Sequence, residues 1–282
     1  MDSKQPTGTQ RARKLRLILV PVVVVGALCL ALLPGTMGAK GPSIIQLTDN
    51  ALNDGNTQID GGKVTWMGYD GNDYEIFLYD GKSTIQITDN AGYDANPQID
   101  GGKVTWEGYD GIDLEIFLYD GKSTIQLTDN ALNDGNPQID SGKVTWQEYD
   151  GNDYEIYLYD GRNTIQLTDN ADYDANPQID GGKVTWEGSD GNDLEIFLYD
   201  GKSTIQLTDN ALVTDFSPQI DGGKVTWHAW DGNDYEIFLY DGKSTIQLTD
   251  NGWDDYGPQI DGGKVIWDGY DGNDWEVYLW TR

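Results

Sequence analysis

The feature that most constrains this chain is a unit of about 40 residues that repeats, nearly unchanged, from residue 44 to residue 282. One copy reads PQIDGGKVTWEGYDGIDLEIFLYDGKSTIQLTDN. Its tryptophan marks six copies, at Trp66, Trp106, Trp146, Trp186, Trp227 and Trp267. A repeat this regular folds as one small unit per copy, and each unit buries its apolar side against the next. The fold of the chain therefore follows from the fold of one unit.

Each unit contains four stretches with the composition of β-strands. In the second unit these stretches, named A to D, cover residues 98–100, 103–109, 114–119 and 124–128. They are rich in β-branched and aromatic residues, and Asp-Gly turns connect them. No helical period follows residue 43. Four short strands in each of six units predict an all-β fold, a six-bladed β-propeller. We expect its core between the blades to contain Val104, Trp106, Ile116 and Leu118.

The register of the strands predicts how the ring closes. The first complete blade covers residues 57–90, whereas the sixth begins at Pro258 and reaches only its third strand by Arg282. Residues 44–50, IIQLTDN, match the fourth strand of the other blades. We therefore expect this N-terminal strand to complete the sixth blade, which would cover an otherwise exposed sheet edge.

The repeat resembles a known family. Its pattern is similar to the TolB-type propeller repeat, a prokaryotic relative of the WD-type repeat, at Pro97, Asp100, Gly101, Val104, Trp106, Asp110, Gly111, residues 115–120 and residues 126–128. The resemblance covers the chain from residue 44 onward and implies six blades, the number of that family. It leaves the function open, because relatives include binding platforms, lyases and accessory domains of peptidases. The family's SPDG turn is IDGG in this chain.

The first 43 residues differ from the rest and form a separate segment, so that the propeller covers 44–282. Five basic residues precede a stretch, residues 17–39, that carries no charge. As a helix this stretch would be roughly 35 Å long, enough to cross a bilayer. We expect a hydrophobic helix that either anchors the protein in the membrane or is cleaved as a signal peptide. Both alternatives predict an extracytoplasmic protein, in the periplasm or at the cell surface.

Charge is distributed unevenly over the predicted propeller. The whole chain has a formal net charge of −30. Every Lys and Arg from residue 40 onward falls in turns that a propeller places on one face, or at its ends. Most Asp and Glu residues fall on the opposite face, which we call the acidic face. A surface of one negative sign repels nucleic acid, and it also suits adaptation to high salt.

The acidic face suggests metal binding. Each blade places two aspartates in the glycine-containing loop between strands B and C, and hard oxygen ligands in such loops suit calcium, although the spacing is not that of an EF-hand. The candidate ligands are Asp70, Asp73, Asp110, Asp113, Asp150, Asp153, Asp190, Asp193, Asp231, Asp234, Asp271 and Asp274.

Departures from the repeat cluster in the fifth and sixth units, in loops expected on the acidic face. These candidate ligand-binding residues are Phe216, His228, Trp230, Trp253, Asp254 and Tyr256. Aromatic rings beside carboxylates suit a carbohydrate or a peptide. Ordinary drift in terminal repeats is the alternative explanation.

Catalytic motifs are sparse. The chain has a single histidine and no G-x-S-x-G sequence, and its carboxylates are too numerous to indicate an acid–base pair. We interpret the chain as an exported, non-enzymatic binding or scaffold propeller of the cell envelope, with an acidic, cation-collecting loop face that binds a protein or carbohydrate. We expect it to be a monomer. The alternative is an enzyme that processes polysaccharide or peptide at a site in blades five and six.

Overall fold

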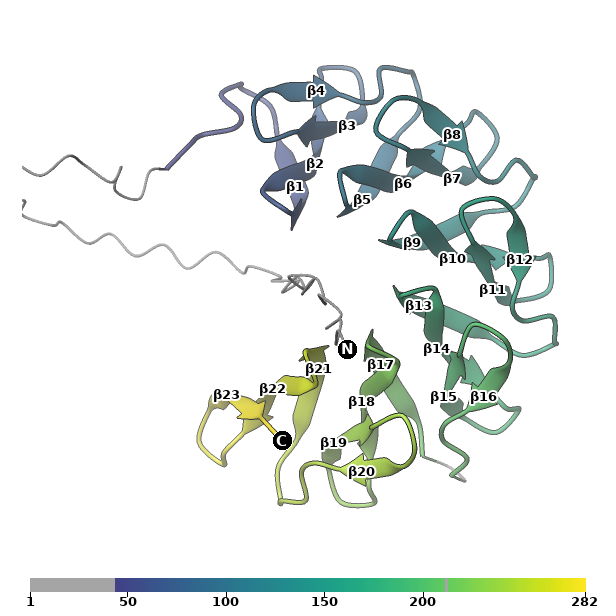
Figure 1. Cartoon of the computed structure of the whole chain (residues 1–282), viewed down its shortest axis with the longest axis vertical. Helices are drawn as coiled ribbons and strands as arrows, with labels where there is room; N and C mark the ends of the chain where they lie inside the picture. Colours follow the sequence, from purple (N-terminus) through teal and green to yellow (C-terminus); the bar gives the residue numbers. More distant parts are fainter. Residues whose placement is uncertain (1–43, 211–212) are drawn as a thin grey trace, which may run out of the picture.

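The computed structural model describes residues 44–210 and 213–282, and these residues form 23 strands in six antiparallel sheets (Figure 1). The strands, sheet by sheet, are β1 (Asp54–Asp60), β2 (Lys63–Tyr69), β3 (Tyr74–Tyr79) and β4 (Thr84–Gln86); β5 (Asp94–Asp100), β6 (Lys103–Tyr109), β7 (Leu114–Tyr119) and β8 (Thr124–Gln126); β9 (Asp134–Asp140), β10 (Lys143–Tyr149), β11 (Tyr154–Tyr159) and β12 (Thr164–Gln166); β13 (Asp174–Asp180), β14 (Lys183–Ser189), β15 (Leu194–Tyr199) and β16 (Thr204–Gln206); β17 (Asp215–Asp221), β18 (Lys224–Trp230), β19 (Tyr235–Tyr240) and β20 (Thr245–Gln247); β21 (Asp255–Asp261), β22 (Lys264–Tyr270) and β23 (Trp275–Trp280). The sheets stand as blades around a central axis, with the first strand of each innermost.

The core lies between consecutive blades, as the sequence predicts. Val104 and Trp106 of β6 pack with Ile76 and Leu78 of the preceding blade, and all four are buried. The same cluster recurs at the following junctions. Trp106 also stacks on Phe117 of its own blade at 5.7 Å between ring centroids. Because each blade presents apolar residues on both sides, its strands are held by their neighbours and not by a single central core.

The innermost strand is longer than predicted because it contains a β-bulge. The pairing of β5 with β6 shifts between Ala95 and Gln98, and Asn96 there has a φ of 51°. Asparagine tolerates this left-handed conformation better than most residues. Equivalent positions have positive φ at Asn136 and Gly257. The strand thus continues past the bulge, and it places an asparagine or serine near the axis in five blades and a glycine in the sixth.

The outermost strand is shorter than predicted, because its last hydrogen bond to the third strand is accepted by a threonine side chain and not by a backbone carbonyl. Thr128 Oγ accepts a hydrogen bond of 2.8 Å from the backbone N–H of Ile116. The backbone N–H of Leu127 still donates to the carbonyl of Ile116 at 2.7 Å. The chain therefore leaves the sheet after Gln126 and begins the loop to the next blade.

The predicted closure by the N-terminal strand is wrong for this structure. The sixth sheet contains three strands, and residues 44–50 form none. Ile44 is 101% exposed, while Val277 on the unpaired edge strand β23 is 75% exposed. Figure 1 shows the arc of blades open between the first and the sixth sheet. Residues 44–50 instead make local hydrogen bonds, such as Gln46 Nε2 to the carbonyl of Thr48 at 2.8 Å.

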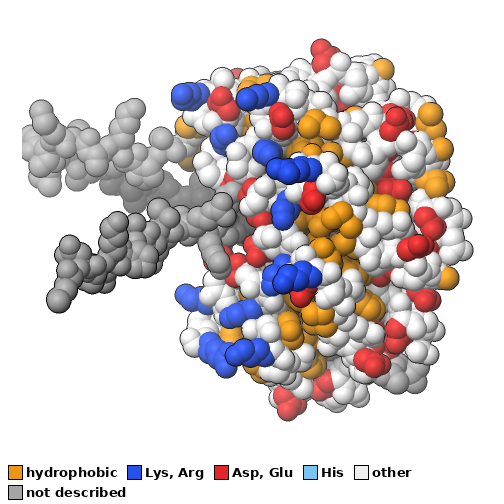
Figure 2. All heavy atoms as spheres, turned by 45° about the vertical axis from the view of Figure 1, so that its right-hand side comes forward, with side chains coloured by type: hydrophobic (Ala, Val, Ile, Leu, Met, Phe, Trp, Pro, Cys, Tyr) orange, Lys and Arg blue, Asp and Glu red, His pale blue; other side chains and the backbone are white. Residues whose placement is uncertain are grey.

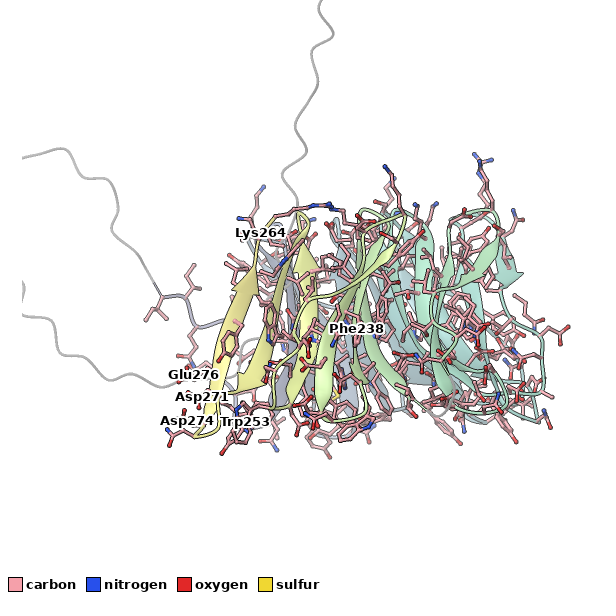
Figure 3. All side chains as sticks on the ribbon, turned by 90° about the horizontal axis from the view of Figure 1, so that it is seen from below. Phe238, Trp253, Lys264, Asp271, Asp274 and Glu276 are labelled. Atoms are coloured by element: carbon pink, nitrogen blue, oxygen red, sulfur yellow. The ribbon has the colours of Figure 1, made fainter. Side chains whose placement is uncertain are left out.

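The two faces carry different charges, as predicted. Lys and Arg side chains gather on one side of the molecule (Figure 2). Lys264 lies at one end of the sixth blade, whereas Asp271 and Asp274 lie at the opposite end (Figure 3). The predicted hydrophobic helix at 17–39 lies outside the described residues. Within the described part of the chain, no helix could span a bilayer.

Candidate functional site

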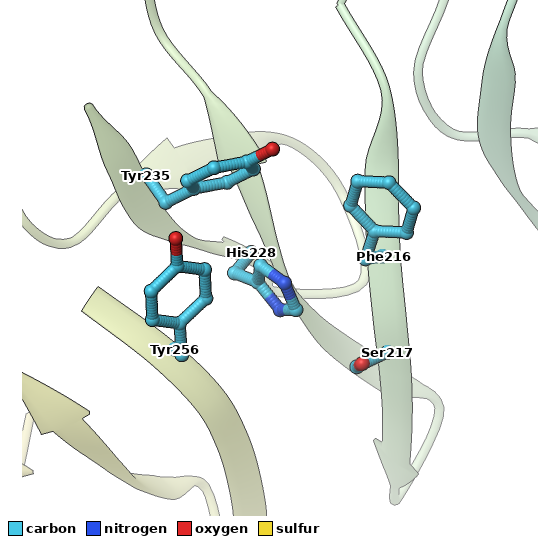
Figure 4. A pocket seen from close by; sticks show the side chains of 5 residues that line it. All are labelled: Phe216, Ser217, His228, Tyr235 and Tyr256. Atoms are coloured by element: carbon cyan, nitrogen blue, oxygen red, sulfur yellow. The ribbon is translucent and has the colours of Figure 1, made fainter. Parts of the chain in front are cut away.

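An aromatic pocket lies where the sequence departs from its repeat. Phe216 and Ser217 of β17, His228 of β18, Tyr235 of β19 and Tyr256 of β21 line a cavity of about 270 Å³ (Figure 4). The ring of His228 stacks against Phe216 with centroids 5.6 Å apart and meets Tyr256 edge-on at 5.2 Å. The ring centroids of Tyr235 and Tyr256 are 4.9 Å apart. Hence blades five and six together form one aromatic wall.

Two substitutions beside the bulge, which all six blades share, distinguish this junction. In blade two the positions of Phe216 and His228 hold Ala95 and Glu107. Glu107 Oε1 accepts the backbone N–H of Asn136 in the next blade at 2.7 Å, which fills the space with a polar contact between blades. At blade five an imidazole replaces that carboxylate and a phenyl ring replaces the methyl group. The polar contact is thereby exchanged for an aromatic cavity.

His228 is the unusual group in the pocket. Its Nδ1 atom is buried and has no hydrogen-bond partner. Burial lowers the pKa of His228 to about 4, so that the imidazole is neutral at pH 7. A base this weak is poorly suited to proton transfer near neutrality. The ring therefore acts as part of the aromatic wall, with a buried polar atom that lacks a partner.

The other candidate residues surround the pocket without all entering it. Trp230 is 38% exposed and meets Tyr235 edge-on at 5.4 Å. Trp253 contacts Tyr270 at 5.4 Å, and Asp254 Oδ1 accepts the backbone N–H of Tyr235 at 3.1 Å. Of the six residues named from the sequence, Phe216, His228 and Tyr256 line the cavity. Trp230 and Asp254 contact the lining residue Tyr235, whereas Trp253 contacts Tyr270.

Two lining residues were missed by the sequence analysis. Tyr235 repeats in other blades, as Tyr154 in the third, so it does not depart from the pattern. Ser217 replaces the asparagine of the bulge, a substitution visible in the sequence once the bulge is known. Comparison between the copies therefore reveals pocket residues that differ from the repeat, but not those that several copies share.

A second set of sites consists of carboxylate clusters on the acidic face. Their oxygens lie within 4.8 Å of one another, close enough to hold a metal ion; the clusters include Asp70, Glu75 and Asp89; Asp110, Glu115 and Asp129; Asp150, Asp153 and Glu155; Asp190, Asp193 and Glu195; and Asp231, Glu236 and Asp250. They contain many of the predicted B–C loop aspartates. They add a glutamate from the third strand and, in three of these five, an aspartate that follows the fourth.

The glutamate of each cluster has an oxygen without a partner. Glu75 is fully buried; its Oε1 accepts the backbone N–H of Asn90 at 2.9 Å, whereas its Oε2 is buried with no hydrogen bond. The same holds for the oxygens of Glu115, Glu155, Glu195 and Glu236. A buried carboxylate oxygen is costly unless it holds a proton or a cation.

Electrostatics agree with this requirement. Burial, with the neighbouring Asp94 contributing, raises the pKa of Glu75 to about 7. Burial, together with the charges of Asp234 and Asp255, raises the pKa of Glu236 to about 7. A carboxyl group with a raised pKa loses its proton more readily when a bound cation replaces that proton. The clusters thus have the chemistry of a cation site.

Comparison with solved structures shows the fold. The propeller domain of the Trilobed protease from Pyrococcus furiosus, described as having an open velcro topology, matches with a TM-score of 0.57 at 14% identity over 80% of this chain and 79% of that chain. The acylaminoacyl peptidase of Pyrococcus horikoshii matches with a TM-score of 0.58 at 15% identity over 81% of this chain and 43% of that chain. A putative TolB from Agrobacterium tumefaciens has a TM-score of 0.46 at 18% identity, over 70% of this chain and 80% of that chain. No family model and no curated protein matches the chain.

These findings confirm the propeller fold and correct the functional interpretation. The matches with TM-scores above 0.5 reported above are propellers of peptidases, and this chain spans less than half of the acylaminoacyl peptidase. The interpretation as a non-enzymatic scaffold of the cell envelope is therefore contradicted. The alternative drawn from the sequence, a peptide-processing role with a site at blades five and six, agrees better with these matches.

Proposed function

We propose that the chain is the peptide-handling propeller of a peptidase and that the pocket at blades five and six binds a side chain of the peptide. The observation that carries this proposal is the aromatic cavity formed by Phe216, His228, Tyr235 and Tyr256, at the junction where the repeat diverges. The peptidase propellers with the same fold support it. The chain would bind and orient substrate for hydrolysis.

The chemistry of the pocket favours a basic side chain. Aromatic faces attract an ammonium or guanidinium group. Asp254, whose Oδ1 accepts the backbone N–H of the lining residue Tyr235, adds a carboxylate next to that residue. The acidic face repels acidic peptides and attracts basic ones over longer distances. We therefore expect arginine or lysine in the pocket, with its cationic group against the aromatic rings.

Binding of short capped peptides tests this function. We expect fluorescein-labelled Ala-Arg-Ala to bind more tightly than Ala-Leu-Ala, and Ala-Glu-Ala to bind weakest, in fluorescence anisotropy. The double variant Phe216→Ala, His228→Glu restores the residues of blade two and keeps a packed junction. It should lose at least about tenfold in affinity, or about 1.4 kcal/mol. Tyr154→Ala, at the position of Tyr235 in blade three, is the matched control and should bind normally. Unchanged affinity in the double variant would refute the site.

We also propose that the carboxylate clusters bind calcium. The donors are all oxygens and the loops contain glycine, which suits a cation that accepts six to eight ligands in flexible geometry. We expect isothermal titration calorimetry on EDTA-treated protein to detect several calcium sites, and magnesium at equal ionic strength to bind more weakly. Glu155→Gln should remove one site. Asp160→Asn, in a turn on the opposite face, should remove none. Identical responses to calcium, magnesium and sodium would exclude a defined site.

Location and assembly are further proposals. We propose that residues 17–39 direct export, so that the propeller is extracytoplasmic, and that the protein is a monomer. Mass spectrometry of the native protein tests the first proposal by showing whether the N-terminal segment is retained. Analytical ultracentrifugation tests the second.

A further inference from the structure

In three of the five clusters, the first blade's among them, one carboxylate comes from the segment that follows a fourth strand. Asp70 and Glu75 come from the loop and third strand of that blade, whereas Asp89 follows β4. The same segment contributes Thr88, whose Oγ accepts the backbone N–H of Ile76, and Asn90, whose N–H donates to Glu75. A Thr-Asp-Asn sequence thus buries the glutamate and brings a third carboxylate to the cluster.

The sixth blade has half of this arrangement. Asp271, Asp274 and Glu276 repeat the loop and the glutamate. Glu276, however, is exposed, whereas Glu75 and its counterparts in the next four blades are fully buried. The sixth sheet has no fourth strand and no Thr-Asp-Asn segment of its own in the structure.

Residues 44–50 hold the complementary half. They end in Thr48, Asp49 and Asn50, and no described sheet precedes them. The turn after them already has the conformation of the complete blades, since Asn50 Oδ1 accepts the N–H of Leu52 at 2.7 Å, as Asn130 Oδ1 does from Leu132 at 2.7 Å. Among the described residues, the segment 44–50 therefore has no glutamate to contact, and Glu276 has no Thr-Asp-Asn segment to bury it.

We infer that a sixth cation site is split between blade six and the N-terminal segment, with Asp271 and Glu276 on one side and Asp49 on the other, and that cation binding draws residues 44–50 onto β23. This inference rests on the proposed calcium binding. Without a cation the three carboxylates would repel one another if residues 44–50 paired with β23. With a cation, the attraction of all three to one ion offsets this repulsion.

The register of the complete blades defines the closed arrangement. Phe77 pairs with Gln86 and Leu78 with Ile85 in the first blade. By the same register Tyr278 lies opposite Gln46, and Leu279 lies opposite Ile45. This pairing reduces the exposure of two apolar side chains. Ile45 is 65% and Leu279 59% exposed in the open arc, whereas their counterparts in the first blade, Ile85 and Leu78, are 36% and 2% exposed. Burial of these side chains adds to the contribution of the cation.

Disulfide trapping tests the closure. In a Cys29→Ser background, Gln46→Cys and Tyr278→Cys place two thiols opposite each other at a position that corresponds to a non-hydrogen-bonded pair of β3 and β4. The Cα atoms of such pairs are about 4.5 Å apart, which permits a disulfide. We expect calcium to accelerate cross-linking about tenfold over EDTA at equal ionic strength, within the usual range for two coupled sites.

Two variants separate this inference from calcium binding as such. Added to the cysteine pair, Glu276→Gln should abolish the effect of calcium on cross-linking, whereas Glu155→Gln should preserve it. Cross-linking that ignores calcium, in protein that still binds calcium at the other junctions, would overturn the split site alone. Absence of all calcium binding would overturn both proposals.

Calorimetry provides a readout that does not depend on the cysteines. Asp49→Asn and Glu276→Gln change exposed side chains and should each remove one calcium site from otherwise unaltered protein. The double variant should also lose only one site, because both residues serve the same ion. Full stoichiometry in either single variant would contradict the inference.

Discussion

At the scale of single residues, one glycine position decides how the conserved tryptophan is held. In blade two, Trp106 Nε1 donates to Asp94 Oδ1 at 2.8 Å. A Cβ atom on Gly108 would lie 2.5 Å from that same oxygen and 2.8 Å from the ring of Phe117. The position must therefore be small for the tryptophan to reach its aspartate.

Blade three breaks this rule. Glu148 occupies the glycine position, and Trp146 Nε1 donates to Glu148 Oε2 at a long 3.4 Å. Asp134 Oδ1 is left buried without a partner. The raised pKa of Asp134, about 9, is the electrostatic consequence.

The first prediction is that Glu148→Gly stabilises the protein. The change should restore the bond from Trp146 to Asp134 and remove a neighbouring negative charge. A buried polar group that gains its partner contributes about 1–3 kcal/mol to the free energy of unfolding. Thermal unfolding at pH 7.5 should show a higher Tm. The control is Glu148→Gln, which removes the charge but keeps the bulk and should have a smaller effect. A glycine variant less stable than the wild type would show that the long bond at Glu148 is the better arrangement.

At the scale of elements, the junction between blades determines how stability depends on pH. Burial raises the pKa of Glu236 and of Asp215 to about 7. Between their ordinary values and pH 7 the folded protein keeps these protons, whereas the unfolded chain has lost them. The unfolded state binds fewer protons in this window, so the free energy of unfolding falls as pH rises.

The second prediction is that, in EDTA, the protein is more stable at pH 5 than at pH 8. His228 acts in the opposite direction, because its lowered pKa favours the folded state as pH rises from about 4 to 6.5, but it is one group against several carboxyls. Denaturant unfolding at both pH values measures the difference. Glu236→Gln should reduce it. Asp200→Asn should not, since backbone N–H groups of Ser203 and Lys202 lower the pKa of Asp200 and its titration falls below this window. Equal stability at both pH values would refute the prediction.

The elements also show what the sequence could predict and why the rest was missed. Alternating apolar residues and Asp-Gly turns located the strands and the core around Trp106. The bulge at Asn96 was missed because positive φ is a tertiary outcome, although asparagine before proline was a signal. Glu75 was missed as a buried ligand because glutamate is rarely buried alone. The aromatic departures led to the pocket because the repeat supplied five other copies for comparison.

At the scale of the whole molecule, the open arc explains where sequence reasoning failed. The match of residues 44–50 to a fourth strand indicates which edge they can pair with. It does not indicate whether the pairing outweighs the repulsion between Asp49, Asp271 and Glu276. If the split site we propose exists, that balance depends on a bound cation, which the sequence does not specify. The sequence thus indicates which strand residues 44–50 can pair with, but not whether they pair with it.

The last prediction concerns the stability of truncated proteins. In EDTA, deleting residues 44–50 together with the segment before them should leave Tm close to that of a protein lacking only 1–43, because five of these seven residues are exposed and none is buried in the open arc. In calcium the two proteins should differ. A site that binds only the folded protein adds about 2.7 kcal/mol at a hundredfold excess of calcium over Kd. The shorter protein lacks Asp49 and should lose about that contribution, while it keeps the stabilisation from the remaining junctions. Calorimetric melting of both proteins at equal ionic strength, with magnesium as a parallel control, measures the loss. An equal calcium-induced rise in Tm for both proteins would mean that residues 44–50 do not help blade six to bind a cation. A lower Tm of the shorter protein already in EDTA would mean that the ring is closed without any cation.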